Sequence, residues 1–214
     1  MQEAESDGSI SPLSTSSKSG LAALCPWFPF APPGPTDTLL DHLRSDLPPW
    51  ERAVTLANIY STHGSFIIRG LTPSQLQDEI LPAVYLRHLP PLEDHSDYSS
   101  PHALALLYGV LAIGALLDPS LSPFNSEADG YADLAAASLG LQSPFHRPSS
   151  LTVQCLQVMY AFYSMRGGDM MDSNATKETV WSLITLAAQV AQLVSVWSGI
   201  CCYLEPNHAS DWIT

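Results

Sequence analysis

The sequence has few basic residues. Only 8 Lys and Arg stand against 21 Asp and Glu in 214 residues, so the formal net charge is -13 at pH 7. Nucleic-acid binding needs a basic face to neutralise phosphates, and docking on anionic lipid needs clustered Lys and Arg. The composition therefore argues against unaided nucleic-acid binding and against docking on an anionic membrane.

Cysteines and export signals are also scarce. The four cysteines are too few for a disulfide scaffold. Residues 1–7 are acidic and lack the basic and apolar regions of a secretory signal. The longest apolar run, 103–117, is shorter than the roughly 20 residues that a membrane-spanning helix needs. We expect an intracellular protein with reduced cysteines and no membrane segment.

Motifs for catalysis are missing as well. The sequence has no Gly-rich phosphate loop, no nucleophile elbow, and no two histidines four residues apart on one helix. The stretch 167–172 lacks the ligand spacing of a calcium loop, and the adjacent Cys201 and Cys202 do not match a structural zinc site. Cys155 lies on an apolar helical stripe, where a buried core residue is expected. We therefore predict no catalytic, cofactor-binding or metal-ligating residue, no cofactor in this chain, and no enzyme.

What the sequence does contain is helical periodicity from Thr36 onward, with no credible alternating strand. The predicted helices cover 36–47, 49–64, 72–88, 101–117, 126–139, 150–166 and 176–193. The helix at 101–117 is apolar on all sides, which is typical of a central helix that is covered all round. We expect an all-α fold in which antiparallel helix pairs form a bundle or short array around this central helix.

Three residues predict local features of these helices. Ala105 and Gly109 lie one turn apart on the central helix and leave room for another helix to approach closely. Pro82 falls within the third helical pattern, where it should kink or interrupt the helix because it has no backbone N–H.

The first 36 residues form a separate Ser- and Pro-rich tail. Such a segment buries too little apolar surface to offset its ordering entropy, so we predict that it is disordered. Within it, 24–30 places three aromatic residues between prolines. This stretch is either a linker that lies on the domain or a short binding motif in an extended conformation.

Several segments between Leu56 and Gln192 carry a likeness to a known family. They are 57–60, 80–85, 104–116, 131–137, 148–156 and 181–192, which read ANIY, ILPAVY, LALLYGVLAIGAL, YADLAAA, PSSLTVQCL and WSLITLAAQVAQ. In order and spacing the set resembles the regulatory, or middle homology, domain of fungal-specific transcription factors. The resemblance implies an all-helical domain over 37–193 that tunes a transcription activator in the nucleus.

Two departures from the family limit what this chain can do. Full-length members usually carry a six-cysteine binuclear zinc cluster that reads DNA, whereas residues 1–36 hold one cysteine and one lysine. Zinc and DNA binding are therefore implied only for full-length members. The likeness also stops after Leu193, and residues 194–214 match nothing in the family pattern. Read-through of an unspliced intron or a frameshift explains this stop, as does a genuine divergent tail; the spliced transcript across codons 185–214 distinguishes them.

The functional expectation is a fragment of a transcription regulator that acts through protein contacts or self-association of helical faces. The alternative is a stand-alone helical interaction module unrelated to transcription. A third possibility, an α-helical enzyme, would need several carboxylates around one cavity, and the sequence shows no such motif. Helix pairs in such arrays cover one another. If the family's later helices are missing, we expect an exposed apolar patch on the helix at 176–193, unless Val194, Val196, Trp197 and Ile200 cover it instead.

Overall fold

The structure, a computed structural model, describes residues 29–30, 36–66, 70–86, 98–123, 125–166 and 173–204. All regular structure in these ranges is helical, which confirms the predicted all-α class. The elements are α2 (Asp37–Ser45), α3 (Trp50–Ile59), η1 (Tyr60–Gly64), η2 (Gln75–Ile80), α4 (Leu81–Leu86), α5 (Pro101–Leu116), α6 (Ser126–Gly140), α7 (Ser150–Arg166) and α8 (Ser173–Leu204). Apart from residues 29, 30 and 36, the tail predicted to be disordered lies outside the described residues, as do 167–172.

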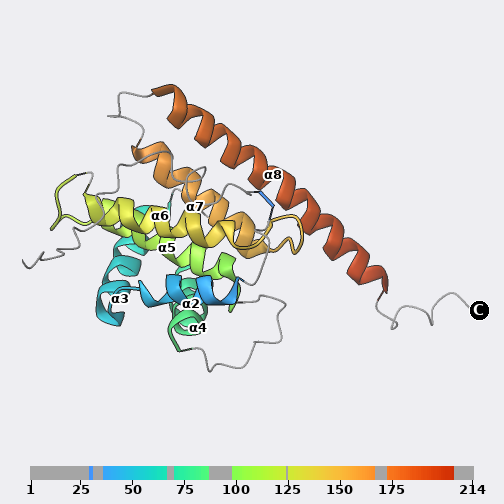
Figure 1. Ribbon diagram of the computed structural model, residues 1–214, viewed down its shortest axis with the longest axis horizontal. Coiled ribbons are helices and arrows are strands. Elements are labelled where there is room, and N and C mark those ends of the chain that lie inside the picture. The colour runs from blue at the N-terminus through green and yellow to red at the C-terminus, as the bar shows by residue number, and fades with distance from the viewer. Residues whose placement is uncertain are drawn as a thin grey trace, which may run out of the picture.

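Helix α5 is the centre of the fold. Every residue from His102 to Ala115 is buried, because α3, α6 and α7 pack against different sides of the helix (Figure 1). Its first turn is capped by the Ser100 hydroxyl, which accepts a hydrogen bond from the Ala103 N–H at 3.3 Å. The prediction of a central apolar helix is confirmed.

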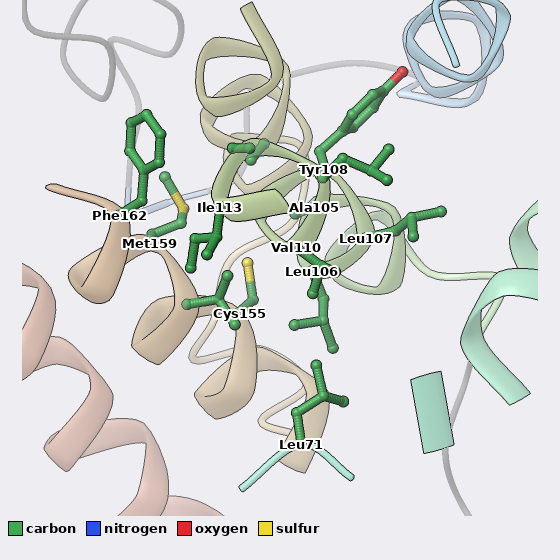
Figure 2. Packing of buried hydrophobic residues seen from close by; sticks show 14 of the residues in the cluster. Leu71, Ala105, Leu106, Leu107, Tyr108, Val110, Ile113, Cys155, Met159 and Phe162 are labelled. Carbon is green, nitrogen blue, oxygen red and sulfur yellow. The ribbon is translucent and has the colours of Figure 1, made fainter. Parts of the chain in front are cut away.

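Side chains of α5 point toward several neighbours at once. Figure 2 shows Ile113 of α5 facing Cys155 and Met159 of α7. Tyr108 points the other way, toward α2, and its hydroxyl donates a hydrogen bond to the Leu43 carbonyl at 2.6 Å. This contact ties the first helix of the domain to the central one.

Two glycines allow the neighbouring helices to approach α5 closely. A Cβ at Gly109 would lie 2.8 Å from the Val158 side chain of α7, so this predicted close approach is confirmed. A Cβ at Gly114 would lie 2.4 Å from the backbone carbonyl oxygen of Leu56 in α3. The second contact was not predicted, and it is the more demanding one because a backbone atom cannot rotate away.

The helix containing Pro82 departs from regular α-helical hydrogen bonding. Residues Gln75–Ile80 are π-helical and are followed directly by α4. Since Pro82 cannot donate a backbone hydrogen bond, the usual pattern cannot continue through it, and the predicted interruption is found beside it. The predicted start is also confirmed, because the Thr72 hydroxyl accepts a hydrogen bond from the Gln75 N–H at 3.1 Å.

Helix α8 is longer than predicted and lies along one side of the molecule. It starts at Ser173 and continues to Leu204, so the predicted domain boundary after Leu193 falls inside it. Its main contacts are with α7, and its C-terminal end extends beyond the other helices (Figure 1). Most of one side of α8 is therefore not covered by the described residues.

We expect Gly114→Ala to destabilise the fold, because the new methyl group would collide with the Leu56 carbonyl. Overpacking of this kind costs about 1–3 kcal/mol, measurable as a lower midpoint in urea unfolding. The matched control is Gly130→Ala in α6, where no atom lies within 4 Å of the added Cβ. That change should leave stability equal or raise it by about 0.5–1 kcal/mol, since Ala is the better helix former. Equal effects of the two variants would contradict the proposed close contact.

Candidate functional site

Residues with catalytic or metal-binding potential are dispersed in the described part of the chain. No group of three or more His, Cys, Asp or Glu there could hold a metal ion. Cys155 is fully buried, and desolvation raises the pKa of its thiol far above the usual value. It therefore packs as a core residue, as predicted, and its side chain faces α5 (Figure 2). Cys25 and the side chains of Cys201 and Cys202 lie outside the described residues.

The main charged cluster joins α3, the turn after α5, and the start of α6. The Arg52 guanidinium donates two hydrogen bonds to the Glu127 carboxylate, at 3.1 and 2.8 Å, and one to Asp118 at 2.9 Å. Asp118 is buried and also accepts hydrogen bonds from the N–H and hydroxyl of Ser120, at 2.9 and 2.7 Å. Tyr131 completes the set by donating to Glu127 at 3.2 Å.

Electrostatics keep this cluster ionised. The hydrogen bonds from Ser120, and then the one hydrogen bond and the charge of Arg52, hold the pKa of Asp118 below its usual value. The pKa of Glu127 is lowered mainly by its hydrogen bonds to Arg52, and the pKa of Arg52 is raised in return. Both carboxylates are hydrogen-bonded to neighbouring side chains in their ionised form. The arrangement is therefore suited to holding helices together rather than to proton transfer.

A second polar network is buried between α5 and α7. His102 Nε2 lies 2.9 Å from the Gln142 carbonyl oxygen, and Nδ1 lies 2.7 Å from the Thr152 hydroxyl. Since a carbonyl only accepts, Nε2 carries the proton, and neutral Nδ1 accepts from Thr152. The Ser149 hydroxyl oxygen lies 2.9 Å from the Thr152 hydroxyl oxygen and continues the chain of hydrogen bonds toward the start of α7. Burial lowers the pKa of His102, which favours this neutral form.

The outward side of α8 exposes large apolar side chains. Trp181 is 71% exposed, Val196 57% and Ile184 42%. On the opposite side of the same helix, Leu183 and Val190 are buried. The helix is thus anchored by one stripe, while apolar side chains on another stripe face away from the core.

This helix also has no charged side chains over most of its length. From Thr179 to Leu204 the sequence contains no Asp, Glu, Lys or Arg. Within α8, Lys177–Val196 is the one stretch of the described residues that is long and apolar enough to cross a membrane, with a mean hydropathy of 1.5 and 17% of it buried. Core helices of soluble proteins meet the same length and composition criteria but are mostly buried, and a single such helix is weak evidence. The predicted absence of a membrane segment stays a prediction.

Comparison with known proteins gives no further assignment. No protein-family model matches the chain, and neither does any curated protein or solved structure.

The sequence predicts no site residue, but it does predict an exposed apolar patch on the helix at 176–193, and α8 carries one at Trp181 and Ile184. The longest uninterrupted apolar run is 103–117, because Ser, Thr and Gln interrupt the apolar residues of α8. The sequence signal for α8 as a long, exposed apolar helix is the absence of charged residues from Thr179 to Leu204. The Arg52 cluster left no local signal, since its members are far apart in the sequence.

Stability should fall as pH decreases through about 6.5, the usual histidine pKa. The unfolded chain then protonates His102 while the folded chain does not, so unfolding takes up a proton and becomes more favourable. This group contributes a slope of at most about 1.4 kcal/mol per pH unit.

Urea unfolding between pH 5.5 and 7.5 measures that slope. His102→Gln should remove the contribution of His102 to the pH dependence of unfolding, even if the substitution also changes the overall stability. His63→Gln, at an exposed histidine, keeps it and serves as the control. A slope that His102→Gln leaves intact would rule out the assigned neutral state.

Proposed function

We propose that the chain is part of the regulatory domain of a fungal-type transcription factor and acts through contacts with proteins. The observation that carries this proposal is the order of the family-like segments. Each one falls on a helix or at its start, in chain order: α3 with η1, η2 with α4, α5, α6, α7 and α8. The apolar segment 104–116, the most extended likeness, is the buried central helix.

The proposed mode of action follows from surface chemistry. A chain with a net charge of -13 is repelled by nucleic-acid phosphates, so DNA would be read by another part of a full-length factor or by another protein. Exposed apolar side chains on α8 offer protein contacts instead. The family resemblance implies a nuclear location, and it implies zinc only for full-length members.

A stand-alone helical interaction module is the second candidate. The same exposed side chains on α8 support it, and it requires no transcription role. The transcript separates the two candidates. An upstream exon that encodes a six-cysteine cluster would favour the regulatory domain. A spliced message that encodes neither this cluster nor any other part of an activator would favour the module.

A reporter assay tests the function directly. The full chain is inserted between a heterologous DNA-binding domain and an activation domain in a fungal host. We expect reporter output to fall relative to a fusion that carries a flexible insert of equal length, because the family's regulatory domain restrains its activator. The Gly114→Ala chain, with its damaged core, should restore output at equal protein level. Output that is unchanged by the folded insert would contradict the proposed role.

A further inference from the structure

We propose that the chain's own N-terminal tail covers the outer face of α8, through residues 21–28. The outer face is the exposed strip of the helix that contains Trp181, Ala188, Gln192 and Val196. Residues 21–28 read LAALCPWF and lie outside the described residues. The contact is autoinhibitory, because a protein that binds the same face must first displace the tail. The inference concerns the chain alone and does not depend on the transcriptional role.

The outer face is one continuous strip that is open to a covering segment. Trp181, Ala188 and Gln192 follow one another at spacings of seven and four, which places them on the same side of an α-helix. All three are exposed, whereas Leu183 and Val190 on the opposite side are buried. A segment can therefore cover the outer face without displacing α7.

The place where the described chain begins points to the tail as that segment. Pro29 and Phe30 are described, and in the view of Figure 1 they overlap the edge of α8 near the middle of that helix. Pro29 is partly buried, whereas Phe30 is 68% exposed. Residues 21–28 directly precede this pair, so they continue the chain from a point in line with α8.

The length of the segment matches the length of the outer face. From Trp181 to Val196 the face is about 22 Å long at 1.5 Å per residue. Eight extended residues span up to about 28 Å. Residues 21–28 are therefore long enough to lie along the whole face.

Covalent attachment favours the tail over a second copy or an untethered protein. A segment held by a short link has an effective concentration on the order of 1 mM at the site beside it. A free partner at about 1 μM must bind roughly 1000 times more tightly to compete. A second copy is also repelled, since each chain has a net charge of -13.

The distribution of charge within the tail selects this part of it. No charged residue occurs from Ser19 to Thr36, and none occurs from Thr179 to Leu204. A contact between these two stretches removes no charged group from water. The first 18 residues contain Glu, Asp and Lys, so they do not suit an apolar face.

The residue types of the segment suit an extended chain on an apolar surface. Residues that precede a proline disfavour the helical conformation, which applies to Cys25 and Phe28. Pro26 has no backbone N–H, so one fewer donor needs a partner beside the apolar face. Trp27 supplies the side chain most often responsible for binding energy at such contacts.

The native Cys25 allows a direct test in the full chain. Cys201→Ser and Cys202→Ser remove the competing thiols, and Cys155 is buried. In this background Ala188→Cys should form a disulfide with Cys25 when oxidised glutathione accepts the electrons. Peptide mapping by mass spectrometry identifies the linked residues, and circular dichroism establishes that each variant is folded. Gln192→Cys, one turn away, provides a second position in case Ala188→Cys does not fold.

Two controls separate docking from random encounter of the tail with the surface. Gly130→Cys in α6 presents an exposed thiol in another helix, with no atom within 4 Å of the added Cβ. It should link to Cys25 several times more slowly than Ala188→Cys. Trp27→Glu should slow the Ala188→Cys link to the rate of that control, whereas Ser17→Glu, which adds the same charge outside the segment, should not.

Three results would overturn the proposal. One is equal linking of Cys25 to Ala188→Cys and to Gly130→Cys. Another is a link at Ala188→Cys that Trp27→Glu does not slow. The third is a product with twice the chain mass of 23.1 kDa, because a disulfide between two chains would assign the outer face to a second copy.

Discussion

Complete burial of α5 is the constraint on which the rest of the fold depends. A helix that is apolar on every side stabilises the folded chain fully only when every side is covered and removed from water. In this chain α3, α6 and α7 supply that cover. Gly109 sets how closely α7 can approach, and Gly114 does the same for α3. The order of the helices around α5 follows from the need to enclose it.

The polar groups at the margins of α5 complete this arrangement. Ser100 caps its start, His102 is hydrogen-bonded on both ring nitrogens, and Asp118 just after its end is held by Arg52. Each of these groups would be costly to bury without a partner. Ser100 bonds within α5 itself, whereas the partners of His102 and Asp118 include groups of the Gln142 turn, α7 and α3. These polar contacts fix some of the neighbours that the apolar contacts bring together.

Much of the fold could be predicted from the sequence because its signals are local. The apolar run of α5, the capping Thr72 and the position of Pro82 each act within a few residues. The π-helical geometry of η1 could not be predicted, since the i to i+5 pattern leaves no periodic signature distinct from an α-helix over one turn. The close contact at Gly114 could not be predicted, because it depends on how α3 packs against α5 in the tertiary structure. The continuation of α8 past Leu193 differs from the predicted end, because the family likeness stops at Leu193 while the residues that follow still form helix.

The attachment of α8 differs from that of the other long helices. Its deeply buried residues are Leu183, Ala187 and Val190, and its main neighbour is α7. The cover of α5 by α3, α6 and α7 does not involve these residues. Amide protons of α8 can therefore exchange with solvent through a local opening that leaves the α5 core closed. The packing of α8 is thus linked to the central helix chiefly through α7.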